Sequence, residues 1–381
     1  MNFFGILENV LQEPQIQFDS TKCRKTKYAE YVCDECIKVC PLQAIENSCP
    51  IEVNGEKCDA CGLCAGICPG EAFYMVKPSY AQLAAEALEN QEITFTCQRK
   101  QCLGAAAIPC LGYLPETLLL GFVLSCSRVR IIFDAKRCDG CSRKAGPLIE
   151  ERLNWVKELA FRFGKAGAVL FDDGNRDEVI SRGEFFALLK NRTRTLARQV
   201  PAPLSEDMPE ERLHQKSLPA SRKLFLNMLR ENVAKEDKAE NALPAPEPVL
   251  VSGENWPFSQ IQVKDSCSGC GDCTLFCPTG ALRVEDRGEG QELLHTPALC
   301  LNCRLCIVQC PRQAISKGEV LDLSVVLTGA STPLKSLGAA TCARCGRPVN
   351  VTVPTQQAEL CSLCEQESGL RVQAKKLMLN F

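Results

Sequence analysis

Apolar and polar positions follow two different periods in the middle of this 381-residue chain. Residues 115–125 and 146–163 carry apolar positions at helical spacing, which predicts two helices. Short runs rich in β-branched and aromatic residues predict three strands, at 93–97, 129–134 and 168–171. Strands that alternate with helices usually form parallel sheets. We therefore expect an α/β domain with a small parallel sheet over residues 79–195.

The segment after this domain has the composition of a linker. Residues 197–260 hold eight of the 22 prolines and many charges, which is typical of a tether between domains. One helix is predicted within it, at 221–232. Just before the linker, residues 181–184 form a capping-box pattern that predicts a short helix at 185–190.

No stretch of the chain has the pattern of a membrane span or an export signal. The most apolar window, residues 103–126, is interrupted by Pro109, Pro115 and Glu116, so no transmembrane helix is expected. Residues 1–11 contain an acidic residue and no basic start, so we predict no leader. Lys and Arg number 44 against 46 Asp and Glu, which gives no basic field for nucleic acid.

The 27 cysteines change this picture, because they fall in tight Cys-x2-Cys groups rather than at the scattered spacings of a disulfide framework. Thiols grouped in this way are typical of metal sites rather than of disulfides, and a metal site can be filled only while its thiols are reduced. We therefore expect a metal-binding protein of the cytoplasm.

The clearest motif lies in residues 263–320. Two runs of Cys-x2-Cys-x2-Cys-x3-Cys-Pro follow one another, which is the spacing of a bacterial dicluster ferredoxin. In that arrangement the fourth cysteine of each run reaches the cluster of the other run. The spacing predicts two [4Fe–4S] ligand sets, Cys267, Cys270, Cys273 and Cys310 for one cluster and Cys277, Cys300, Cys303 and Cys306 for the other.

Residues 1–78 repeat this module with one departure: Glu30 stands where the leading cysteine of the first run belongs. Either Cys23 or Cys49 can replace it, and we favour Cys23, which lies on the correct side of the loop; a three-iron cluster without a fourth thiolate is the alternative. The predicted sets are Cys23, Cys33, Cys36 and Cys68 for one centre and Cys40, Cys58, Cys61 and Cys64 for the next.

Six further cysteines lie in the middle domain, several of them at the ends of predicted strands, where they can converge on one sheet edge. The motifs that carry a family resemblance are Phe95-Thr-Cys97, Cys102-Leu-Gly-Ala, Pro109-Cys110-Leu-Gly, residues 115–122 and Cys138-Asp-Gly-Cys141. This segment resembles the delta subunit of methyl-viologen-reducing hydrogenase over about 80 residues.

The resemblance implies a [2Fe–2S] cluster that passes electrons to a heterodisulfide-reductase-like flavoprotein. Two spacings differ from the family: four residues instead of two separate Cys97 from Cys102, and two residues instead of four separate Cys138 from Cys141. The implied ligands are Cys97 or Cys102, together with Cys110, Cys138 and Cys141. Cys126 is expected to be a buried structural thiol, and a domain without any cluster remains the alternative.

The tail carries a third kind of site. Cys342-x2-Cys345-Gly346 and, fifteen residues later, Cys361-x2-Cys364 match a four-cysteine zinc ribbon. Four thiolates leave no open position, so zinc would be structural, and mononuclear iron is the redox-active alternative. The two histidines, His214 and His295, have polar sequence neighbours and are expected at the surface.

No nucleotide or flavin motif and no catalytic residue are found, so the chain is expected to exchange electrons without converting a substrate itself. We predict an α+β polyferredoxin that relays electrons within a hetero-oligomeric complex with flavin- or molybdenum-containing oxidoreductase subunits. A scaffold, maturation or redox-sensing protein is the alternative. The expected domains are 1–78, a dicluster module; 79–195, the α/β domain; 196–262, the linker; 263–320, the second module; and 321–381, the zinc ribbon.

Overall fold

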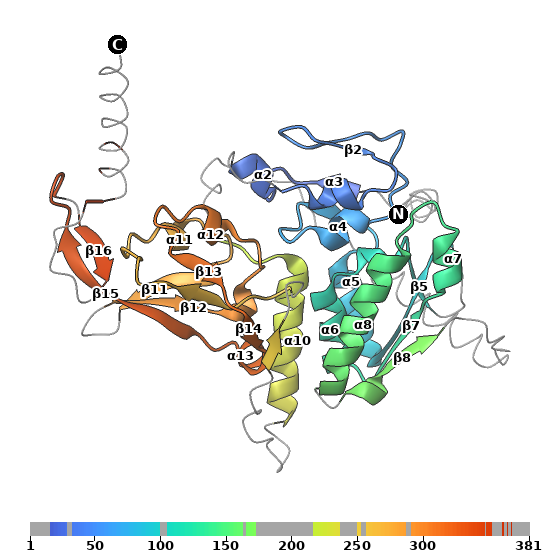
Figure 1. Cartoon of the computed structure of the whole chain (residues 1–381). Coiled ribbons are helices and arrows are strands. Elements are labelled where there is room, and N and C mark those ends of the chain that lie inside the picture. Colours follow the sequence, from blue (N-terminus) through green and yellow to red (C-terminus); the bar gives the residue numbers. More distant parts are fainter. Residues whose placement is uncertain are drawn as a thin grey trace, which may run out of the picture. The chain divides into compact units, whose positions relative to one another are not determined.

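The chain folds into two compact units, which are described separately. Unit 1 comprises Met1–Gln215 and Pro219–Glu240, and unit 2 comprises Lys216–Leu218 and Asn241–Phe381 (Figure 1). The structure is a computed structural model that describes residues 16–28, 33–99, 105–162, 165–172, 216–236, 250–252, 257–286, 291–346, 348–352, 360–361, 364 and 367. The helix expected at 185–190 lies outside these residues.

Unit 1 begins with a small module of two antiparallel strand pairs. The first strand pairs with the last, Ile16 opposite Met75, and a short hairpin lies between them in sequence. Three short helices connect the strands, and two of them begin within or directly after a cysteine loop. The elements are β1 (Ile16–Phe18), α2 (Arg24–Lys27), α3 (Glu35–Val39), β2 (Ile45–Glu46), β3 (Glu52–Val53), α4 (Leu63–Ile67) and β4 (Phe73–Met75).

The middle of unit 1 is an α/β domain whose sheet is parallel throughout, in the order β6-β5-β7-β8. The strands and helices that the sequence pattern predicts are present. The elements are α5 (Tyr80–Asn90), β5 (Glu92–Cys97), β6 (Ala106–Ile108), a 3-10 helix (Leu111–Tyr113), α6 (Glu116–Ser125), β7 (Arg128–Ile132), α7 (Ala135–Asp139), α8 (Gly146–Arg162), a second 3-10 helix (Ala166–Ala168) and β8 (Val169–Asp172).

Helix α6 is the centre of this domain. The crossovers through α6 and α8 run in the same direction along the sheet, so both helices cover one face of it (Figure 1). Every residue from Thr117 to Ser125 is buried, because α6 is enclosed by the sheet, α8 and a further helix, α10 (Ala220–Glu236). Phe95 of β5 and Phe122 of α6 pack with ring centroids 5.2 Å apart.

Helix α10, which the sequence places in the linker, packs on α6 of unit 1. Its first two backbone N–H groups donate to the carboxylate of Glu71, from Ala220 at 2.6 Å and from Ser221 at 2.8 Å. A carboxylate at a helix N-terminus accepts hydrogen bonds from the free amide donors and interacts favourably with the positive end of the helix dipole. Gly121 allows the close approach, because a Cβ there would lie 2.8 Å from the sulfur of Met228.

The dicluster module and the α/β domain share one hydrophobic core. The buried side chain of Arg152 on α8 connects them: its guanidinium donates to the Glu116 carboxylate at 2.6 Å and to the carbonyls of Gly112 at 2.8 Å and Gly66 at 2.9 Å. Gly66 lies on α4 of the module, and the other two residues lie in the domain. The two parts therefore form a single packed body.

Unit 2 repeats the module and extends it. Again the first strand pairs with a late one, β10 with β13, around a central hairpin, β11 with β12. Strand β12 also pairs with β15, and β15 with β16, which makes a four-stranded antiparallel sheet. The elements are β9 (Leu250–Ser252), β10 (Ile261–Val263), α11 (Asp272–Leu275), β11 (Leu282–Asp286), β12 (Gln291–His295), a 3-10 helix (Pro297–Leu299), α12 (Leu305–Val308), β13 (Ile315–Lys317), β14 (Val320–Asp322), α13 (Leu323–Thr328), β15 (Thr332–Thr341) and β16 (Pro348–Thr352).

No helix within the described ranges is long and apolar enough to cross a membrane.

Candidate metal centres

A turn that follows each Cys-Pro pair is built in the same way four times. The third residue after the cysteine has a left-handed backbone: Gln43 (φ 50°), Glu71 (φ 51°), Gly280 (φ 73°) and Gln313 (φ 49°). The next residue is each time a buried alanine: Ala44, Ala72, Ala281 and Ala314. This conformation directs a backbone N–H at the cysteine sulfur. The donors are Ala44 to Cys40 at 3.3 Å, Ala72 to Cys68 at 3.4 Å, Leu282 to Cys277 at 3.5 Å and Ala314 to Cys310 at 3.3 Å.

These four cysteines are the ones that the sequence predicts to cross to the neighbouring cluster. Hydrogen bonds to the ligand sulfurs are one of the features by which a protein tunes an iron–sulfur cluster. The first half of the N-terminal module, although it lacks its leading cysteine, keeps this turn at Cys40.

The cysteine loops show a second repeated geometry. In three of them the residues on both sides of the central cysteine are left-handed: Ala60 and Gly62, Gly269 and Gly271, and Asn302 and Arg304. Successive amides in such a turn form a concave donor site that suits an anionic group. The loop of Cys33 differs, because Asp34 has a φ of −134°; this is also the loop in which Glu30 replaces cysteine, and Glu30 lies outside the described residues.

Two cavities in unit 2 are each lined by one predicted ligand set. Cys277, Cys300, Cys303 and Cys306 line the first cavity, and Cys267, Cys270, Cys273 and Cys310 line the second. Each set therefore combines three cysteines of one loop with the fourth of the other. The two sets are neighbours, since the charges of Cys277 and Cys273 both act on the thiol of Cys306.

A third cavity lies in unit 1. Cys23, Cys33, Cys36 and Cys68 line it, whereas Cys49 is exposed and is absent from the described lining. Three basic residues, Lys22, Arg24 and Lys25, and one acidic residue, Glu35, also line this cavity. The excess of positive charge partly offsets the negative charge that four thiolates would gather there.

The remaining ligand set of the module also comes together. Burial raises the pKa of Cys64 well above its usual value, and the charges of Cys61, Cys58, Cys36 and Cys40 raise it further. Three of these belong to the predicted set and Cys36 to the neighbouring one. The two sets of unit 1 are therefore adjacent, as in unit 2.

In the α/β domain, four cysteines gather where strands β5 and β7 end. Burial raises the pKa of Cys110 to about 11, with further contributions from Cys97 and Cys138; the charges of Cys97 and Cys141 likewise act on Cys138. Arg99 donates to the sulfur of Cys141 at 3.2 Å. Cys102 lies outside the described residues.

Cys126 is separate from this group. Cys126 precedes the start of β7, whereas Cys97 is the last residue of the parallel strand β5. The two cysteines therefore lie at opposite ends of these strands. The buried sulfur of Cys126 donates to the carbonyl of Ala87 at 3.6 Å. This environment is that of a structural thiol.

One buried arginine lies between the module and the cysteine group of the α/β domain. Arg143 donates through Nε to the carboxylate of Asp59, at 2.7 Å, and through a guanidinium nitrogen to the carbonyl of Pro109. Asp59 lies in the Cys58–Cys61 loop, and Pro109 precedes Cys110. The charge of Cys110 also contributes to the raised pKa of Cys61, about 12, which is mainly due to burial. The ligand set that contains Cys61 and the cysteine group that contains Cys110 are therefore neighbours.

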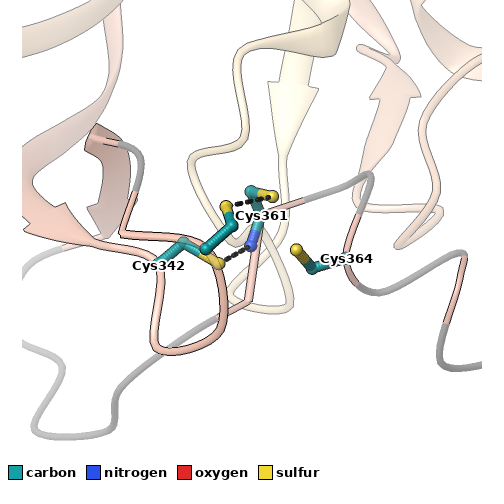
Figure 2. A group of neighbouring side chains, drawn as sticks. Cys342, Cys361 and Cys364 are labelled. Atoms are coloured by element: carbon teal, nitrogen blue, oxygen red, sulfur yellow. Dashed lines mark hydrogen bonds between the residues drawn. The ribbon is translucent and has the colours of Figure 1, made fainter.

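The tail holds four cysteines in a tight group. The sulfurs of Cys342, Cys345, Cys361 and Cys364 all lie within 4.8 Å of one another, and Figure 2 shows three of these residues around a common centre. The Cys345 and Cys361 sulfurs are 3.7 Å apart, close to the roughly 3.8 Å edge of a tetrahedron with metal–sulfur bonds of about 2.3 Å. Backbone donors, first that of Cys361, lower the pKa of Cys342. The group suits a metal ion.

Comparison with known proteins agrees with this arrangement. Residues 266–314 match the family model of a 4Fe–4S dicluster domain, and residues 51–74 match that of a 4Fe–4S binding domain. Over 60 residues the chain is 32% identical to the pyruvate synthase subunit PorD of Methanocaldococcus jannaschii, a match that covers 16% of this chain and 66% of that relative's length. This chain is an iron–sulfur protein with 4Fe–4S ferredoxin domains. Its middle domain lies outside both matched segments.

One expectation about this iron–sulfur protein was wrong. His295 was expected at the surface, but its side chain is fully buried and the residue lines the cavity of Cys277, Cys300, Cys303 and Cys306. The polar neighbour that suggested exposure, Thr296, is itself buried, because β12 is an inner strand of the four-stranded sheet. His214 lies outside the described residues.

Proposed function

We propose that this protein is an electron-relay subunit of a larger oxidoreductase complex and carries four [4Fe–4S] clusters. The proposal rests mainly on the crossed lining of the cavities: three cysteines of one loop and a fourth from the other line each of the two cavities in unit 2. A single zinc or iron ion needs no such crossing between two loops, whereas paired cubane clusters use it.

The donor chemistry fits such clusters. Burial raises the pKa of Cys36, Cys61 and Cys273 to about 12 each, so several thiolates could not remain together in these cavities without a positive partner. Bound iron would supply that partner, and the clusters supply one-electron redox chemistry. The proposed ligands are the four predicted sets, with Cys23 rather than Cys49 completing the first.

Unit 1 has a third group of cysteines beside its two predicted [4Fe–4S] ligand sets. We propose that Cys97, Cys110, Cys138 and Cys141 hold a [2Fe–2S] cluster, in keeping with the resemblance to the hydrogenase delta subunit. The proximity of Cys110 to Cys61 and of Cys64 to Cys36 arranges three sites in a row. A row of neighbouring clusters is what transfer between two partner proteins requires.

The partners are proposed from the same resemblance and from the relative. The likeness to a pyruvate synthase subunit supports assembly with other oxidoreductase subunits, and we propose a flavin- or molybdenum-containing one at one end of the relay. The number of thiolate ligands favours the reducing conditions of the cytoplasm. In the tail we propose structural zinc in a ribbon-like site, because the four sulfurs leave no position for a further ligand.

The experiment is a metal count combined with spectroscopy on anaerobically purified protein. We expect roughly 16 to 18 iron atoms per chain with matching acid-labile sulfide, about one zinc, and cubane EPR signals that form with dithionite and disappear on reoxidation. Clusters that cannot be reduced and reoxidised would contradict the relay and favour a scaffold or sensory role. Far less iron with several zinc ions would contradict the ligand assignment itself.

A further inference from the structure

His295 is a buried polar side chain with no hydrogen-bond partner for its ring. Its exposed fraction is 0%, and among the described residues neither Nδ1 nor Nε2 has a partner. An unsatisfied polar group in a protein interior is costly and rare. Its retention on an inner strand indicates that something absent from the polypeptide satisfies it.

The position of His295 points to the cluster of the first cavity. In the β11–β12 pair it lies directly opposite Leu282, and the backbone N–H of Leu282 donates to the sulfur of Cys277 at 3.5 Å. His295 also lines the cavity that Cys277 shares with three other cysteines. The imidazole is therefore next to the predicted fourth ligand of this cluster.

The chemistry of the ring agrees with a donor role. The ring has a donor in every protonation state, because a neutral imidazole carries one N–H and an imidazolium carries two. Four cysteines already supply the thiolates of this site, so the imidazole is not required as an iron ligand. The sulfur atoms of the cluster and of its thiolates, which share this cavity with the ring, are the acceptors that an N–H donor would find there.

Among the described residues, the lining of the sister cavity has no histidine. Beside Cys267, Cys270, Cys273 and Cys310, it includes the apolar Val284, Leu293 and Leu337 and the polar Ser268, Asp272 and Arg312. The two sites of one module therefore differ in that only the first has a buried imidazole in its described lining. A hydrogen bond to sulfur stabilises the more negative, reduced form of an iron–sulfur cluster and raises its potential.

We propose that the imidazole of His295 donates a hydrogen bond to a sulfur of the cluster held by Cys277, Cys300, Cys303 and Cys306. The inference rests on the proposed function, since it requires that cluster. The hydrogen bond raises the potential of this cluster above the value that it would have without the donor, so an electron shared by the two clusters shifts toward it and the imidazole keeps its proton. His295 is thus a positioning residue for the electron rather than a ligand.

The first test uses the full chain labelled only in its histidines. The sequence has only two histidines. In protein labelled with ¹⁵N in its histidines alone, any ¹⁵N signal comes from His214 or His295. Pulsed EPR of the dithionite-reduced protein is expected to show a ¹⁵N coupling to a reduced cluster. The coupling should persist in His214→Gln and disappear in His295→Leu. Reducible clusters without any ¹⁵N coupling would overturn this inference alone, whereas absence of reducible clusters would overturn the proposed function.

The second test measures potentials. In His295→Leu the electron's equilibrium preference for this cluster over its sister is expected to fall roughly tenfold or more, the effect of losing a hydrogen bond to a charged sulfur. His295→Gln keeps an N–H donor and should restore most of that preference. Equal distributions in wild type and His295→Leu, at equal iron content, would refute the proposal.

Discussion

Gly66 lies where α4 of the N-terminal module packs against the 3-10 helix of the α/β domain, and replacing it with alanine tests this contact. A Cβ at residue 66 would lie 2.2 Å from the carbonyl oxygen of Gly112 and 2.7 Å from that of Tyr113. Carbon–oxygen contacts need roughly 3.3 Å, so α4 and the facing 3-10 helix must separate by about 1 Å. Both partners are backbone, so no side-chain rotation relieves the clash.

The separation has two costs. Overpacking of this kind costs about 1–3 kcal/mol, and moving Gly66 also stretches its hydrogen bond to the buried guanidinium of Arg152, now 2.9 Å, at about 1.5 kcal/mol. A total of about 3 kcal/mol corresponds to a fall of roughly 6 to 12 °C in the melting temperature of a unit of this size.

Anaerobic calorimetry of the cluster-loaded full chain, at one fixed scan rate, is the assay. Gly55→Ala is the matched control, because a Cβ there meets no atom within 4 Å, and its transition should remain within about 2 °C of wild type. If Gly66→Ala melts together with this control, α4 does not contact the 3-10 helix and the single-body account of unit 1 is wrong.

Three further substitutions test the ligands and the core. Cys23→Ser should lower the iron content by about one to four atoms per chain, whereas Cys49→Ser should leave it unchanged; the reverse pattern would assign the ligand to Cys49. Arg152→Met removes the hydrogen-bond donor of the Glu116 carboxylate and of the carbonyls of Gly66, Gly112 and Leu114, and should destabilise unit 1 by about 3–5 kcal/mol in denaturant titration. The exposed Arg162→Met is its control, and a similar effect of both would argue against the buried network. Cys361→Ser should remove the tail metal, measured by mass spectrometry, with the iron count retained; a retained metal would exclude Cys361 as a ligand.

Local spacing carried most of the site prediction. The crossed sets of the two modules follow from intervals of two and three residues between cysteines, and the convergence of Cys97, Cys110, Cys138 and Cys141 follows from parallel strands that end at one edge. These features are encoded within short segments. Strands β5, β7 and β8 and helices α6 and α8 of the α/β domain were predicted for the same reason, whereas α5, β6 and α7 were not.

Long-range contacts were not predictable in this way. Nothing in the sequence near residue 220 indicates that α10 begins on the carboxylate of Glu71, and the polar neighbours of His295 gave no sign of its burial. The ion pair of Arg143 with Asp59 joins residues 84 positions apart. Such partners are chosen by the packing of the whole unit, so a window of sequence does not contain them.

The continuous sheet of unit 2 has a consequence for how the protein matures. Strand β15 carries Leu337, which lines the cavity of Cys267, Cys270, Cys273 and Cys310, and the same strand ends beside Cys342 of the tail. A metal in the tail would fasten this strand at its far end and keep the apolar wall closed. If both proposed sites are filled, the order in which they fill decides whether this wall is already held in place when the neighbouring cluster is built.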